Sequence, residues 1–151
     1  MDKLDRKILQ VLQTNARASL QEIGQAIGLS HSPCWNRIKK MEDSGVIEGY
    51  TVRLNAAALN LAETVLVQVT LDSHSDNTLE KFGEVLAKIP EVVEAYLVSG
   101  DYDYLLRIAV SGTQDYERLL REKLYKIKGI RHSKSSFVLR TLKKADLPLL
   151  P

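Results

Sequence analysis

Residues 19–45, SLQEIGQAIGLSHSPCWNRIKKMEDSG, decide the fold of the first part of the chain. Ser19 is followed three residues later by Glu22, a capping-box pattern in which each side chain satisfies a free amide at the start of a helix. This pattern predicts that a helix begins at Leu20. Gly28 can adopt the positive φ of a helix C-terminal cap, so we expect the helix to end there.

The second half of this stretch predicts another helix, with Ser32 as the N-cap and Pro33 in the first turn. The helix is expected to end near Gly45. Apolar residues recur along it with helical spacing and form an inward stripe of Cys34, Ile38 and Met41.

An earlier helix is predicted by apolar residues that form one stripe, Leu4, Ile8, Val11 and Leu12. Two helices joined by a short glycine turn and braced by a third are typical of the tri-helical DNA-binding module. We therefore interpret residues 1–52 as a helix-turn-helix domain.

The last helix of this module presents a polar, basic face opposite its apolar stripe. Asn36 can form two hydrogen bonds with adenine, and lysines can reach guanine edges or phosphates. The free amides at the helix N-terminus suit a phosphate. The candidate DNA-binding residues are Ser30, His31, Ser32, Trp35, Asn36, Arg37, Lys39 and Lys40.

Each of these residues also has a structural interpretation. Lysines on an outward helix face are usually just solvated, and Trp35 is more often a packed ring than a base contact. Arg37 lies nearer the core, where it reaches a phosphate or pairs with an acid. Cys34 is interpreted as a small core residue. The three histidines lack metal-spaced companions and are interpreted as surface residues: His31, His74 and His132.

After Gly45 the pattern changes. Residues 46–52 favour an extended conformation, so we expect a short strand or small hairpin there. Residues 53–63 have no strong periodicity and are interpreted as the linker between two domains.

The second half alternates between strand and helix periods. The expected order is a strand at 65–71, a helix ending at Pro90, strands at 92–98 and 103–110, a helix from Tyr116 to Ile127 that is capped by Gly129, and a strand at 133–142. This βαββαβ order predicts a ferredoxin-like domain over residues 64–142, followed by a tail at 143–151. The fold class is therefore α+β.

Right-handed crossovers place both helices of such a domain on one face of the sheet and leave the other face bare. The strands carry apolar residues on both faces, for example Leu66 beside Val65 and Leu105 beside Leu106. An exposed apolar face of that size needs cover, so we predict a homodimer through the sheet faces.

Composition limits the class of protein. The chain has 151 residues, 44% hydrophobic and 26% charged, with a net charge of +2. Residues 1–61 hold 8 basic and 6 acidic side chains, and residues 62–151 hold 13 of each. The charged start lacks the apolar core of a signal peptide and no apolar run is long enough to span a membrane, so we expect a soluble cytoplasmic protein. The single cysteine excludes an intrachain disulfide and a thiolate-rich metal site.

Several segments together resemble the Lrp/AsnC (leucine-responsive, feast/famine) regulators. They are Gly28–Ser30, Ser32–Cys34, Arg37–Glu42, Gly45–Ile47, Gly49–Thr51 and Val98–Leu106. The resemblance runs from about Leu4 to Leu142. It implies a winged or plain helix-turn-helix that binds double-stranded DNA at the nucleoid, a ligand-sensing domain, dimers that assemble further, commonly into octamers, and an amino-acid effector bound between dimers.

The resemblance places the effector pocket at the turn between the second and third strands and at the adjoining subunit interface. Asp101 or Asp103 would receive the ammonium group, and the amides of the turn would receive the carboxylate. The last strand contributes further candidates. The candidate effector-binding residues are Ser99, Gly100, Asp101, Tyr102, Asp103, Tyr104, Ser133, Ser135 and Ser136. A solvated acidic hairpin is the alternative interpretation, and one of Tyr102 and Tyr104 can be a core residue.

These features favour a DNA-binding transcriptional regulator, without a catalytic site, a metal or a cofactor other than the effector. One rival is an enzyme, because siroheme decarboxylases share the two-part layout, although only His132 lies near a plausible catalytic face. Another is a DNA-architectural protein without an effector, and a third is a stand-alone amino-acid sensor.

Overall fold

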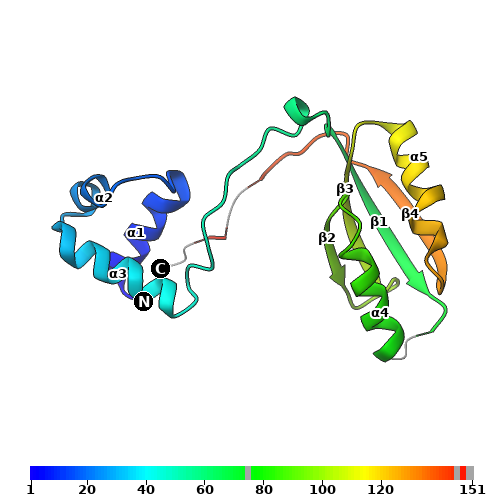
Figure 1. The fold of residues 1–151 in the computed structure, drawn as a ribbon, viewed down its shortest axis with the longest axis horizontal. Helices are drawn as coiled ribbons and strands as arrows, with labels where there is room; N and C mark the ends of the chain where they lie inside the picture. The colour runs from blue at the N-terminus through cyan, green and yellow to red at the C-terminus, as the bar shows by residue number, and fades with distance from the viewer. Residues whose placement is uncertain (74–75, 145–146, 149–151) are drawn as a thin grey trace. The chain divides into compact units, whose positions relative to one another are not determined.

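The computed structural model describes residues 1–73, 76–144 and 147–148, so His74 and residues 149–151 lie outside the described residues. The chain divides into two compact units. The helical unit comprises Met1–Arg53 and the described residues from Leu142 onward, and the sheet unit comprises Leu54–Thr141 (Figure 1). Among the described residues, no helix is long and apolar enough to cross a membrane.

The helical unit contains α1 (Lys3–Thr14), α2 (Leu20–Ile27) and α3 (His31–Asp43). The predicted capping box of α2 is present, because the Ser19 hydroxyl accepts from the Glu22 amide and the Glu22 carboxylate accepts from the Ser19 amide. Gly28 ends α2 with a φ of 76°, in the left-handed region that glycine adopts at little cost.

The start of α3 differs from the prediction. Its N-cap is Ser30 rather than Ser32, and the Cys34 amide donates to the Ser30 carbonyl over 3.3 Å. Pro33 still lies in the first turn, where an amide would have no partner within the helix. Ser30 and Ser32 both precede this proline and are separated only by His31, so the sequence offers either serine as the N-cap.

The core of the helical unit contains the buried residues of all three helices: Ile8, Ile23, Ile27, Cys34, Ile38 and Met41. Cys34 lies on the inner side of α3 with no exposed surface, as predicted, and burial raises the pKa of its thiol. The outer side of α3 is therefore left to its polar residues.

The prediction of a strand or hairpin at residues 46–52 is wrong, because none of these residues is in a strand. They fold back on α3 instead. The Ile47 amide donates to the Met41 carbonyl over 3.0 Å, and the Tyr50 hydroxyl donates to Glu42 Oε1 over 2.9 Å. The β-branched residues of this segment favour an extended backbone, but no neighbouring strand pairs with them.

The sheet unit contains β1 (Glu63–Leu71), α4 (Asp76–Leu86), β2 (Val92–Leu97), β3 (Tyr104–Val110), α5 (Thr113–Glu122) and β4 (Ile130–Phe137). The strands form one antiparallel sheet in the order β2-β3-β1-β4, so β2 and β4 are the edge strands (Figure 1). The βαββαβ order and the α+β class are confirmed.

Both helices cover the same face of this sheet. Phe82 of α4 and Tyr116 of α5 lie in one buried cluster with alternate residues of β1 and β3, such as Val67 and Leu106. The intervening residues of those strands lie on the other face, which no element in the described part of the unit covers. This arrangement matches the prediction of one bare face.

Four elements differ from the predictions. Helix α4 ends at Leu86, before the expected end at Pro90. A one-turn helix, η1 (Ala57–Leu59), forms within the expected linker. The helix predicted from Tyr116 to Ile127 is divided into α5 and a one-turn helix, η2 (Leu124–Lys126), because the backbone of Lys123 leaves the helical conformation. The last strand starts and ends earlier than the predicted 133–142, because its register is set by pairing with β1.

Candidate functional site

The outward face of α3 is exposed. Ser32, Asn36 and Lys40 are exposed on the helix that buries Cys34. Asn36 and Lys40 form no hydrogen bond or ion pair within the described part of the chain. Lys39 is also exposed, but its Nζ lies 2.8 Å from Asp43 Oδ1, four residues along α3. The amide of Asn36 and the ammonium group of Lys40 are therefore available to bind a ligand.

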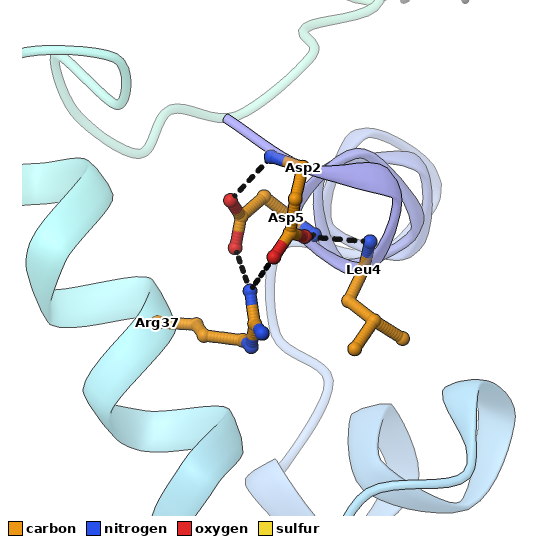
Figure 2. Close-up of polar contacts among 4 residues, drawn as sticks. All are labelled: Asp2, Leu4, Asp5 and Arg37. Atoms are coloured by element: carbon orange, nitrogen blue, oxygen red, sulfur yellow. Dashed lines mark hydrogen bonds and ion pairs between the residues drawn. The ribbon is translucent and has the colours of Figure 1, made fainter.

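Arg37 is held by two carboxylates (Figure 2). Its Nη1 donates to Asp2 Oδ2 and to Asp5 Oδ1, each over 2.7 Å. Of the two roles considered for Arg37, the structure therefore shows pairing with acids. Asp2 and Asp5 also form a capping box at the start of α1, so Arg37 fixes that helix end against α3.

The charge state of this cluster follows from its hydrogen bonds. The pKa of Asp2 is lowered to about 2 by the amide of Asp5 and by Arg37. The pKa of Asp5 is also lowered, because the Asp2 amide and Arg37 together outweigh its partial burial. Both carboxylates are therefore negative at neutral pH.

A shallow hollow lies between the start of α1 and α3, with Asp2, Arg37, Asn36 and Lys40 among its lining residues. Its walls carry an arginine that is already neutralised and a lysine that is not. Positive charge for an approaching phosphate therefore comes from Lys40 rather than from Arg37.

Trp35 lies on the flank of the α3 face with 51% of its surface exposed, and it is not part of the helical core. The alternative that Trp35 is a packed ring therefore has no support in the isolated chain. His31 is exposed as well, and Ser30 caps the helix without a side-chain hydrogen bond.

The turn between β2 and β3 is fixed to the central strand β1 through Asp103. The Asp103 amide donates to the Val69 carbonyl over 2.9 Å, and Asp103 Oδ2 accepts from the Leu71 amide over 2.7 Å. Within the turn, the Val98 amide donates to the Asp103 carbonyl over 2.9 Å. Asp103 is thus a positioning residue of the turn.

The tip of this turn is open to solvent. Ser99, Gly100 and Asp101 are exposed, and the φ of Gly100 is 130°, a conformation that side chains disfavour. Tyr102 is half-buried. Tyr104 is a core residue, because its side chain is 5% exposed, packs against Phe82 and donates a hydrogen bond to the Leu79 carbonyl. Of the two tyrosines, Tyr104 is therefore the structural one.

The three serine candidates on β4 do not share one face. Ser133 and Ser135 are opposite Val69 and Val67, whose side chains are buried under the helices, and the Ser135 hydroxyl bonds with the Tyr116 hydroxyl. Ser136 is opposite Leu66, on the bare face. Ser133 lies nearest the turn, because Asp103 also bonds to Val69. The structure therefore brings only Ser133 toward the turn within one subunit.

Sequence reasoning missed the Asp2–Asp5–Arg37 cluster. The signal that could have found it is the Asp2-x-x-Asp5 spacing at the start of the first apolar stripe, which is a variant of the capping box. Within the described residues, no group of three or more His, Cys, Asp or Glu side chains is arranged to hold a metal ion.

Two family models match the chain. The AsnC-type helix-turn-helix domain matches residues 1–42, and the Lrp/AsnC ligand binding domain matches residues 64–148. The leucine-responsive regulatory proteins of Klebsiella pneumoniae and Escherichia coli K12 are each 36% identical over 146 residues, covering 97% of this chain and 89% of the relative.

Solved structures resemble the whole chain. An AsnC family transcriptional regulator from Agrobacterium tumefaciens is 41% identical with a TM-score of 0.94, covering 99% of this chain and 97% of that one. A transcriptional regulator from Neisseria meningitidis, solved in complex with L-Met, is 33% identical with a TM-score of 0.93 and the same coverage.

Proposed function

Since the chain belongs to the Lrp/AsnC family, and is therefore an amino-acid-responsive transcriptional regulator rather than an enzyme, we propose which of its surfaces bind DNA and effector. The α3 face enters the major groove of double-stranded DNA. The residues proposed to contact the duplex are Ser30, His31, Ser32, Trp35, Asn36, Lys39 and Lys40. Arg37 is proposed to orient α3 through Asp2 and Asp5 rather than to contact bases.

The observation that carries this proposal is that Asn36 and Lys40 are exposed and unpartnered within the described residues. An asparagine amide in the major groove matches the donor and acceptor of an adenine edge, whereas a lysine contacts either a guanine edge or a phosphate. Asn36 is therefore the proposed source of sequence preference, and Lys40 of general affinity.

Replacing Asn36 with alanine is expected to weaken binding to the specific duplex by roughly 1 to 3 kcal/mol, because one bidentate base contact is lost. Binding to random DNA is expected to change little. Fluorescence anisotropy with both duplexes at one salt concentration measures the two affinities.

Gln10→Ala is the matched control, because it removes a similar amide from an exposed position on α1. An equal loss on specific and random DNA after Asn36→Ala would show that Asn36 contacts only the backbone. No loss on either duplex would remove α3 from the interface.

We further propose a homodimer through the bare sheet face, with assembly to a higher order such as an octamer. Leu66, Leu105 and Tyr96 lie on that face with apolar surface exposed, which supports a protein partner. The face is more mixed than the sequence predicted, because Arg107 and Glu94 form an ion pair of 2.7 Å across it. A dimer would place two α3 helices about one helical turn apart on DNA.

The proposed effector is an amino acid bound between dimers at the β2–β3 turn. The Neisseria relative was solved with L-Met and other relatives are named leucine-responsive, which supports this ligand class. Asp101 is exposed at the tip and suits an ammonium group, while the turn's amides suit a carboxylate. The proposed residues are Ser99, Gly100, Asp101, Tyr102, Asp103 and Ser133, with Tyr104 supporting the turn from the core. Ser135 and Ser136 lie farther along β4 and are proposed to contribute only across the subunit interface.

Asp101→Asn is expected to weaken effector binding roughly 10- to 100-fold, because a hydrogen bond to a charged group is worth about 1.5 to 3 kcal/mol. A thermal-shift screen of the twenty amino acids first identifies the ligand, and calorimetry then compares the variants. Glu122→Gln on α5 is the control, since it removes an exposed carboxylate next to Lys123, which pairs with Glu91 at the opposite end of β2 from the turn.

Unchanged affinity in Asp101→Asn would exclude this carboxylate as the ammonium partner. If no amino acid changes the melting temperature or the particle size, a DNA-architectural role without an effector becomes the better account. We place the protein in the cytoplasm, with the nucleoid, because that is where its proposed duplex partner lies.

A further inference from the structure

The balance of acids and bases in residues 62–151 conceals a separation of charge along the chain. From Lys123 to Lys144 the sequence contains eight Lys or Arg and no Asp or Glu. Residues 62–122 therefore hold nearly all the carboxylates of this half. A total over the whole half cannot detect such a segregation.

The fold places these bases along one edge of the sheet unit. Strand β4 pairs only with β1, so its outer side is an edge of the sheet (Figure 1). Its eight residues span about 26 Å at roughly 3.3 Å per residue. Four exposed side chains lie on this strand or beside its ends, and together they are termed the basic strip: Lys126, Lys128, Arg131 and Arg140. Lys134 is not included, because it is opposite Gln68 on the bare face that the proposed dimer covers.

The neighbouring carboxylates do not neutralise the basic strip. Helix α5 packs next to β4 through Tyr116, yet its acids are engaged by its own arginines. Asp115 pairs with Arg118, and Glu117 pairs with Arg121. Within the described residues, no ion pair involves a side chain of the basic strip. Asp72 lies beside the start of β4, because its amide donates to the Gly129 carbonyl over 2.8 Å, but its carboxylate is not in an ion pair with the strip. The cations of the basic strip are therefore exposed and not engaged in ion pairs.

We propose that the basic strip binds phosphates of the DNA duplex whose sequence α3 reads, as a second contact that is independent of sequence. A duplex presents a regular row of negative charges, and a linear array of unpaired cations is the complementary surface. The inference rests on the proposed function, because a duplex bound by the helical unit is held at high local concentration near the sheet unit.

A second copy of the chain is a less suitable partner. The acids at the opposite sheet edge are already used within the chain, because Glu91 pairs with Lys123 and Glu94 pairs with Arg107. A purely protective role is the other alternative, since charges on an edge strand prevent sheets from joining edge to edge.

The test compares two doubly neutralised forms of the full-length protein. Lys128→Gln with Arg131→Gln removes two charges before and at the irregular start of β4, outside the positions assigned to the bare face. Lys81→Gln with Lys88→Gln removes two exposed charges on and after α4, in the same unit. The measured quantity is the slope of log affinity against log salt concentration, on a long random-sequence duplex and on the specific one.

The strip variant is expected to reduce this slope by about 2 on both duplexes, because each phosphate contact contributes about 0.9. The α4 variant is expected to keep the parent slope. Failure of the proposed function would be seen in a different measurement. In that case Asn36→Ala would leave the ratio of specific to random affinity unchanged, whatever salt slope the strip variant shows.

Three results would overturn the proposal. An unchanged slope in the strip variant, with normal size and solubility, would exclude phosphate contact. An unchanged slope with a smaller particle in sedimentation would assign the basic strip to contacts between copies. An unchanged slope with aggregation would assign it to protection of the sheet edge.

Discussion

Replacing Gly24 with alanine is expected to unfold the helical unit and abolish DNA binding. A Cβ at this position would lie 2.4 Å from the carbonyl oxygen of Leu29, which is backbone and cannot rotate away. The turn between α2 and α3 would have to shift, at a cost of about 3 kcal/mol. That is a large share of the stability of so small a unit. Hydrogen exchange across residues 19–45 and DNA titration measure the effect.

The matched control is the same substitution at Gly83, within α4, where a Cβ would meet no atom within 4 Å. Gly83→Ala is expected to stabilise the sheet unit by about 0.5 to 1 kcal/mol, because alanine loses less backbone entropy in a helix. Normal exchange protection in Gly24→Ala would show that the turn tolerates the added methyl group.

Leu106→Ala is expected to destabilise the sheet unit by about 3 kcal/mol, through lost burial and the cavity that remains. Leu106 has no exposed surface and lies in β3 opposite Val67 of β1 and Ala95 of β2. Urea denaturation followed by circular dichroism measures the loss, which is expected to be the same at every protein concentration. Effector binding is expected to fall with it.

Leu66→Ala separates the core from the proposed dimer face. Leu66 is 36% exposed on the bare face, so its truncation is expected to cost the single subunit little. If a second sheet covers that face, the variant dissociates at a higher concentration than the parent in sedimentation. Identical sedimentation of parent and variant would argue against the sheet-face dimer.

Short sequence patterns predicted most of this fold, because the interactions that they imply form between residues close together in the sequence. The Ser19–Glu22 capping box and the left-handed Gly28 fixed both ends of α2 without reference to the rest of the chain. Alternation in β1 likewise identified the buried face, since residues of one parity pack under the helices.

The errors arise where a distant partner decides the outcome. Residues 46–52 have strand propensity, but Met41 and Glu42 of α3 supply their hydrogen-bond partners instead of a second strand. The end of β4 depends on where β1 begins, which the sequence of β4 does not contain. For the candidate sites, periodicity identified the outward face of α3, but it could not decide whether Arg37 met a phosphate or the carboxylates of Asp2 and Asp5.

The inward position of Cys34 has a practical consequence for studying this protein. It is the only cysteine of the chain, it has no exposed surface, and burial raises the pKa of its thiol, so an alkylating reagent meets little thiolate while α3 is docked. Modification of the thiol then requires α3 to separate from α1 and α2. The rate at which the Cys34 thiol is labelled therefore reports how often the helical unit opens. No added probe is needed, and the sheet unit gives no signal because Cys34 is the only cysteine of the chain.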